Sequence, residues 1–158
     1  MIHTVWVGIL ALVLDRASKA WAMSWLRVQP GGSFALWPGV LHLTYAQNTG
    51  MAFSLFEEYT WILALLTPLA LLLVVIALKY AMPCTRLQNG LLWLLLAGGV
   101  GNLIDRVVYG YVVDFLEIRL FRFAIFNLAD VYLTLAAILL IIALLLTPDA
   151  KEIKRDDA

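Results

Sequence analysis

The stretch GNLIDRVVYGYVVDFLEIRLFRFAIFNLAD, residues 101–130, decides how the rest of the chain is organised. It places Asp114 and Asp130 between two long apolar runs, with Asn102 and Arg106 at the end of the first run. An ionisable group inside a membrane is energetically costly, so its presence there indicates a functional site. Because Asp114 and Asp130 lie on either side of a turn, the sequence allows their carboxylates to meet in space as a dyad.

The composition is that of an integral membrane protein. Hydrophobic residues make up 63% of the 158 residues, charged residues make up 14%, and the mean hydropathy is +0.90, which is too apolar for a soluble domain of this size. The net charge is zero, so the chain has no basic surface of the kind that binds nucleic acid. Cys84 is the single cysteine and there are two histidines, so we expect no disulfide, no metal centre and no cofactor.

Four apolar segments are predicted to span the membrane as helices, within a single domain that covers residues 1–158. The predicted spans are approximately residues 4–26, 60–79, 89–108 and 126–147, with an insert at 27–59. A membrane-spanning helix needs about 20 residues, each adding about 1.5 Å. The distribution of Lys and Arg slightly favours the cytoplasmic side for both termini and for the loop that contains Cys84.

The first predicted span contains three charged residues, Asp15, Arg16 and Lys19. A secretory signal peptide is the competing interpretation of this apolar segment, but no Lys or Arg precedes the segment and the three charges interrupt it. Asp15 and Lys19 are four residues apart on one helix face, so we expect them to pair. We favour a structural role for this pair over a catalytic one.

The insert between the first two spans has the pattern of a small sheet at the membrane interface. Gly31-Gly32 and Pro38-Gly39 predict turns, and apolar and polar residues alternate at 41–45, which is typical of a short strand. His42 falls in this strand and is expected to be a surface residue. The sequence Asn48-Thr49-Gly50 predicts a further turn, and residues 51–56 are expected to form a short interfacial helix.

Small residues cluster in the third predicted span, at Ala97, Gly98, Gly99 and Gly101. Small side chains let the backbone of a neighbouring helix approach closely. We therefore expect tight helix packing along this segment, which by itself carries no chemistry.

Four sequence blocks, taken in order, resemble the lipoprotein signal peptidases, the type II signal peptidases of bacteria. The blocks are LDRASK (14–19), QNTGMAFS (47–54), GNLIDRVVYGYVVDF (101–115) and FNLAD (126–130). The resemblance implies an α-helical integral membrane protein of four transmembrane helices, with a small periplasmic β-cradle and a short periplasmic helix. It also implies a multi-pass protein of the bacterial inner membrane whose active site lies near the periplasmic face.

The same resemblance implies an aspartyl endopeptidase that removes signal peptides from prolipoproteins, cutting before the diacylglyceryl-modified cysteine. The family motifs place the catalytic aspartates at Asp114 and Asp130. The expected partners are the lipidated precursor and membrane lipid, without nucleic acid, and the enzyme is expected to act as a monomer. The family residues that line the site match Asp15, Lys19, Asn48, Gly50, Asn102, Arg106, Asn127 and Ala129.

Three positions depart from the family pattern. Arg16 stands where the family commonly has glutamine, Met51 where it has alanine, and Val131 where a serine usually follows the second aspartate. None of the three removes a catalytic group, so we expect changes in substrate preference or acidity rather than loss of activity.

Other interpretations of the two aspartates remain open at the level of the residues. Asp114 and Asp130 could instead form structural ion pairs with Arg106, Arg119 or Arg122. A small transporter or channel would need polar residues across both membrane halves, whereas here they cluster toward one side. A presenilin-type protease would carry a Gly-x-Gly-Asp signature, which is absent, and a membrane scaffold would not need two carboxylates beside asparagines.

Overall fold

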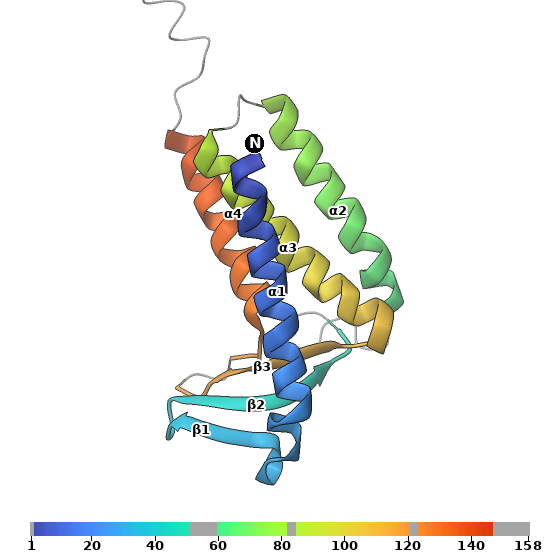
Figure 1. The fold of residues 1–158 in the computed structure, drawn as a ribbon, viewed down its shortest axis with the longest axis vertical. Helices are drawn as coiled ribbons and strands as arrows, with labels where there is room; N and C mark the ends of the chain where they lie inside the picture. Colours follow the sequence, from blue (N-terminus) through green and yellow to red (C-terminus); the bar gives the residue numbers. More distant parts are fainter. Residues whose placement is uncertain (1, 51–59, 82–84, 121–122, 147–158) are drawn as a thin grey trace, which may run out of the picture.

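The computed structural model describes residues 2–50, 60–81, 85–120 and 123–146. Four long helices and a three-stranded sheet make up this part of the chain, with the sheet at one end of the helices (Figure 1). In chain order the elements are α1 (Ile2–Ser24), η1 (Leu26–Val28), η2 (Pro30–Gly32), β1 (Ser33–Trp37), β2 (Leu41–Asn48), α2 (Thr60–Ala81), α3 (Arg86–Tyr109), β3 (Val112–Ile118) and α4 (Leu128–Leu146).

Three of the four helices are long and apolar enough to cross a membrane: α2, α3 and α4, with hydropathies of 2.5, 1.6 and 2.6 over their best segments. Only 6% of the α2 segment is buried within the protein. Its exposed surface is therefore apolar, as a lipid-facing surface must be. The first predicted span forms the 23-residue helix α1, which carries its three charged residues, Asp15, Arg16 and Lys19, close together in its second half.

The helix boundaries lie within a few residues of those predicted. The third helix begins at Arg86 rather than near 89, because Thr85 and Gln88 form a capping box that starts the helix earlier. It ends at Tyr109, and the next residue, Gly110, has a φ of 77°, the left-handed conformation that glycine adopts most readily. The fourth helix begins at Leu128 rather than near 126, because Phe126 is bonded to β3.

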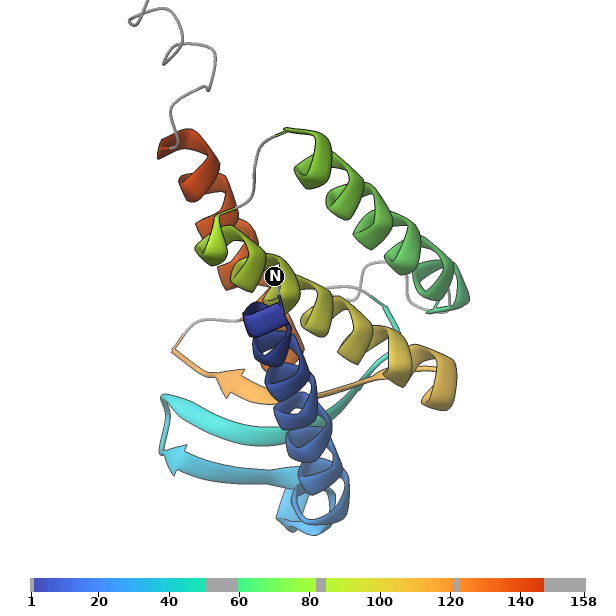
Figure 2. The ribbon, with the colours of Figure 1, turned by 45° about the horizontal axis from the view of Figure 1, so that its top comes forward.

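Helix α3 is the central helix, since it contacts α1, α2 and α4 (Figures 1 and 2). A Cβ atom added to Gly98 would lie 2.5 Å from the Ala129 carbonyl oxygen of α4. On Gly99 it would lie 2.7 Å from Leu71 of α2. On Gly101 it would lie 2.5 Å from a carboxylate oxygen of α1. The expected close helix packing is confirmed, and each glycine serves a different neighbour.

The strands pair in the order β1-β2-β3, and both pairs are antiparallel. The strands predicted within the insert are confirmed as β1 and β2, with His42 in β2. Positive φ angles at Gly31, Gly32 and Gly39 confirm the predicted turns. The expected interfacial helix at 51–56, and Met51 within it, lie outside the described residues.

Strand β3, which carries Asp114, is not among the strands that the sequence pattern predicted. It pairs with β2 along one edge, from Leu41 opposite Ile118 to Asn48 opposite Val112. On its other edge, Leu116 and Phe126 exchange backbone hydrogen bonds of 2.7 and 3.0 Å. This contact holds the residues that precede α4 against the strand that carries Asp114.

Candidate active site

Asp114 reaches the site because of its place in β3. Its neighbours Val113 and Phe115 are buried in an apolar cluster with Ala22 and Leu26. Successive side chains of a strand point to opposite faces, so Asp114 points away from that cluster. Only 1% of Asp114 is exposed.

Asp130 lies in the first turn of α4, and it forms a reciprocal cap with Asn127, the residue that precedes the helix. The Asp130 backbone N–H donates to Asn127 Oδ1 at 3.1 Å, and the Asn127 backbone N–H donates to Asp130 Oδ2 at 3.1 Å. Such a pair satisfies two backbone donors at a helix start. It also fixes the position of the Asp130 carboxylate.

Asn127 links the two aspartates. Its side-chain amide Nδ2 donates to Asp114 Oδ1 at 2.6 Å, while its Oδ1 accepts from the Asp130 backbone. Two further asparagines complete the arrangement: Asn48 Nδ2 donates to Asp114 Oδ2 at 2.9 Å, and Asn102 Nδ2 donates to Asp130 Oδ1 at 2.7 Å. Every oxygen of the two carboxylates therefore receives an N–H donor.

The environment of Asp114 favours the protonated form despite these donors. Burial, followed by the nearby charge of Asp130, raises the pKa of Asp114 from 3.8 to about 7, while hydrogen bonds from Asn48 and Asn127 lower it. Two neighbouring carboxylates in a buried site do not both ionise easily. At neutral pH the pair is therefore suited to holding one proton.

The alternative of structural ion pairs is not found among the described residues. Arg119 pairs with Glu117 at 2.9 Å, on the exposed part of the sheet. Arg106 donates to the Gly50 carbonyl oxygen at 3.3 Å. Arg122 lies outside the described residues. Within the described part of the chain, neither Asp114 nor Asp130 forms an ion pair with an arginine.

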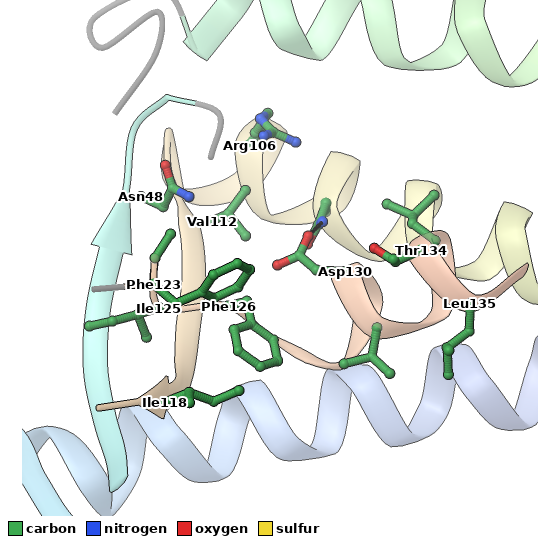
Figure 3. Close-up of a pocket in the computed structure, with 14 residues that line it drawn as sticks. Asn48, Arg106, Val112, Ile118, Phe123, Ile125, Phe126, Asp130, Thr134 and Leu135 are labelled. Carbon is green, nitrogen blue, oxygen red and sulfur yellow. Dashed lines mark hydrogen bonds between the residues drawn. The ribbon is translucent and has the colours of Figure 1, made fainter. Parts of the chain in front are cut away.

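Two cavities meet at this polar cluster. The larger one has a volume of about 540 Å³ and is lined mainly by β3, α4 and the segment 123–126 (Figure 3). Figure 3 shows Asp130 pointing into it opposite apolar side chains such as Phe126. The smaller one, about 300 Å³, lies between α2, α3 and α4. Asn102, Arg106 and Asp130 border both cavities.

Arg106, at this junction, has one buried donor without a partner in the described part of the chain. Its Nε atom is buried and has no hydrogen-bond partner among the described residues. A buried N–H group without a partner is uncommon in folded proteins. Because the Arg106 side chain also borders both cavities, its guanidinium places a positive charge at their junction.

A second charged cluster lies behind the dyad and is nearly sealed from solvent. Lys19 Nζ lies 3.2 Å from Asp15 Oδ2 and 2.9 Å from Asp105 Oδ2, and all three side chains are fully buried. The predicted pairing of Asp15 with Lys19 is thus confirmed. Arg16, 27% exposed, pairs with the other oxygen of Asp105. Two anions and two cations make this cluster electrically neutral.

Asp105 is the buried group that the sequence did not assign to the site. Besides its two cations, it accepts the backbone N–H of Val113 at 3.2 Å and so holds the start of β3 beside Asp114. The i,i+3 spacing from Asn102 was visible in the sequence, but its partners Arg16 and Lys19 are nearly ninety residues away.

The predicted lining residues fall into two groups. Asn48, Asn102 and Arg106 line the larger cavity, as does Val131, one of the departures from the family pattern. The others lie behind this surface: Asn127 between the carboxylates, Gly50 as the acceptor of Arg106, Ala129 donating its N–H to Asp15 at 3.1 Å, and the pair Asp15 and Lys19.

These features define a class of protein: an integral membrane protein with a buried carboxylate pair where its helices meet a small sheet. The model of the signal peptidase (SPase) II family matches residues 7–146. The chain belongs to this family, which comprises the lipoprotein signal peptidases.

Similar proteins support the same assignment. The chain is 43% identical to a lipoprotein signal peptidase of Gloeothece citriformis over 142 residues, covering 87% of this chain and 85% of the relative. A lipoprotein signal peptidase of Streptococcus agalactiae is 39% identical over 144 residues, covering 87% and 88%. One of Lactococcus lactis is 36% identical over 143 residues, covering 90% and 93%.

Two solved structures, each described as a bacterial membrane enzyme, have the same fold. The first superposes with a TM-score of 0.82 at 30% identity and covers 92% of this chain and 88% of its own. The second has a TM-score of 0.81 at 29% identity, with coverage of 94% and 96%. The family assignment thus rests on sequence and on three-dimensional structure.

Proposed function

We propose that the chain is an aspartyl endopeptidase that removes signal peptides from bacterial prolipoproteins, cutting before the diacylglyceryl-modified cysteine. The observation that carries the proposal is the arrangement of Asp114 and Asp130. They come from a strand and a helix, are joined through Asn127, and meet beside a cavity of about 540 Å³.

The pair works with one shared proton. The ionised carboxylate takes a proton from a water molecule as the water oxygen attacks the carbonyl carbon of the scissile bond. The protonated carboxyl gives its proton to the carbonyl oxygen. When the C–N bond breaks, the carboxyl that took the water proton gives it to the leaving nitrogen, and the other carboxylate takes a proton from a hydroxyl of the tetrahedral diol, which restores the shared proton. Because water is the nucleophile, no covalent intermediate with the enzyme forms. The proton belongs to the coupled pair rather than to one residue.

The surroundings of the pair suit a peptide that carries acyl chains. The Arg106 guanidinium borders both cavities, where it can attract a substrate carbonyl oxygen. The larger cavity offers apolar walls from Phe123, Phe126 and Leu135. Binding of the acyl chains to these walls would position the scissile bond at the dyad. Such positioning supplies much of the rate enhancement of an enzyme.

We further propose that α1 spans the membrane with the other three helices. The enzyme would be a multi-pass protein of the bacterial inner membrane, with both termini cytoplasmic, the active site near the periplasmic face, and a monomer as the working form. The sheet at one end of the helices supports this placement, because the dyad lies at that end. Cys84, which lies outside the described residues, should then react with an impermeant thiol reagent only after the cytoplasmic face is opened.

Replacement of the aspartates tests the proposal. Asp114→Asn and Asp130→Asn should each abolish cleavage of a diacylglyceryl prolipoprotein by purified protein, because an amide cannot act as the base. Glu117→Gln is the matched control, since Glu117 is also a carboxylate of β3 but pairs with Arg119 away from the cavities. It should cleave at the normal rate. Normal turnover by either aspartate variant would remove that residue from the mechanism.

A further inference from the structure

The fully buried ammonium of Lys19 has a contact that its ion pairs do not explain. Besides Asp15 and Asp105, its Nζ donates to Asn102 Oδ1 at 2.8 Å. Lys19 borders neither of the cavities at the dyad and has no exposed surface, so it does not touch the substrate. Asn102, in contrast, borders both cavities and donates to Asp130.

An ammonium has three donors and no acceptor. Three oxygens surround the Lys19 Nζ atom: Asn102 Oδ1 at 2.8 Å, Asp105 Oδ2 at 2.9 Å and Asp15 Oδ2 at 3.2 Å. Only an oxygen can face such a group, so Lys19 dictates which end of the Asn102 amide points toward α1. If the amide turned over, its NH₂ would face the ammonium and its oxygen would face the Asp130 carboxylate. Both contacts would be repulsive.

The orientation set at Asn102 passes on to the second aspartate. Asn102 Oδ1 also accepts from Asn127 Nδ2 at 3.2 Å, and the same Asn127 nitrogen donates to Asp114 at 2.6 Å. An amide nitrogen has two protons, and here one serves Asn102 and the other serves Asp114. Lys19 and Asn127 thus donate to the same oxygen of Asn102, and the orientation that Lys19 sets at Asn102 also offers Asn127 an acceptor that keeps its NH₂ group beside Asp114.

We propose that Lys19 is a positioning residue of the peptidase: its ammonium fixes the amides of Asn102 and Asn127 so that both present N–H groups to Asp114 and Asp130. This inference rests on the proposed dyad. Asp15, Asp105 and Arg16 hold the ammonium in place and balance its charge. The charged groups whose fields act on the dyad from the neighbouring helices are then Lys19 from α1 and Arg106 from α3.

A double substitution removes the donor without changing the net charge. In Asp15→Asn/Lys19→Met one cation and one anion are lost together, and methionine cannot donate to Asn102. We expect kcat on diacylglyceryl prolipoprotein to fall at least tenfold while KM stays within twofold. We also expect a change in how kcat depends on pH. The acid limb, where kcat falls as the pH is lowered, should move to higher pH by half a unit or more, because the carboxylates lose oriented donors.

The conservative variant is Lys19→Arg, which keeps a charged group that only donates. It should recover most of the kcat that the methionine variant loses and should keep the acid limb in its normal place. If the methionine variant does not fold in detergent, Asp15→Asn/Lys19→Gln replaces it. Glutamine is polar but one bond shorter than lysine, so it reaches Asn102 poorly, and it should give the same displacement of the acid limb.

The outcomes separate the two proposals. An unchanged acid limb in folded protein without the donor would show that Lys19 only neutralises Asp15 and Asp105, and the inference would be overturned. The same conclusion would follow if Lys19→Arg and the donor-free variant lost equal activity without a change in the profile. Cleavage by Asp114→Asn or Asp130→Asn in the same micelles would instead overturn the dyad itself.

Discussion

Gly98→Ala offers a sharp test of how helix packing controls the site. The added Cβ would lie 2.5 Å from the Ala129 carbonyl oxygen and 2.9 Å from Leu133 Cγ. Ordinary contact begins at 3.4 Å. The obstacle at Ala129 is backbone, so it cannot be relieved by a side-chain rotation. The first turn of α4, which carries Asp130, would have to move by about 1 Å, and a misplacement of about that size can cost roughly 100-fold in rate.

We therefore expect Gly98→Ala to lower kcat on diacylglyceryl prolipoprotein by about 100-fold. The packing strain costs about 1–3 kcal/mol, partly offset by about 0.5–1 kcal/mol of improved helix propensity, so the protein should remain folded. Gly90→Ala is the matched control, because it lies in the same helix and a Cβ there meets nothing within 4 Å. It should be at least as stable as the parent and fully active. Gly98→Ala with normal kcat and normal thermal stability would refute the argument that this close approach fixes Asp130.

Three further predictions follow from the buried charges and the cavities. Because the pKa of Asp114 is raised from 3.8 to about 7, the folded state keeps a proton that the unfolded chain has lost within this window. The free energy of unfolding should therefore decrease as pH rises through that range. Thermal unfolding in detergent should show a weaker pH dependence for Asp114→Asn. An equal pH dependence in both proteins would contradict the buried location of Asp114. Asp105→Asn should destabilise the protein by about 3–5 kcal/mol, because Arg16 and Lys19 lose the buried anion that they share. Arg16→Gln should cost less in the same unfolding measurement, because the Arg16 side chain is partly exposed. At saturating substrate, a precursor without acyl chains should be cut far more slowly than the diacylglyceryl form, because each buried methylene contributes about 0.8 kcal/mol toward holding the peptide at membrane depth. Equal rates for the two precursors would show that the acyl chains do not position the substrate, as in a general aspartyl protease.

The helices and the candidate dyad could be predicted from the sequence. Long apolar runs predict spanning helices because the membrane demands about 20 apolar residues. The i,i+4 spacing of Asp15 and Lys19 predicts an ion pair because helix geometry places those side chains together. Both predictions depend only on residues that are near one another in the sequence. The structure confirms the ion pair of Asp15 and Lys19, and it shows that three of the four predicted spans are helices apolar enough to cross a membrane.

The parts that the sequence missed depend on contacts between distant residues. Residues 112–118 read VVDFLEI, and four successive buried residues hide the alternation by which strands are usually found. What makes this segment a strand is its pairing with β2 on one edge and with Phe126 on the other. Similarly, the contact of Lys19 with Asn102 joins residues 83 positions apart, and no spacing rule could have predicted it.

The arrangement of α3 explains why small and polar residues alternate within one short segment. Gly98 faces α4, and Asn102, four residues later on the same face, bonds to Asp130 of α4. Gly101 faces α1, and Asp105, again four residues later, pairs with Arg16 and Lys19 of α1.

The third face of α3 is directed toward α2. Gly99 contacts Leu71, and Arg106, two turns further along the helix, borders the cavity that Gly99 also lines. Toward α4 and α1, a glycine first brings the neighbouring helix close, and a polar side chain one turn later bonds to that helix. Residues four apart share a helix face, so enlarging Gly98 or Gly101 would displace a specific polar contact. The glycine-rich segment thus places the charges of the site although it carries none itself.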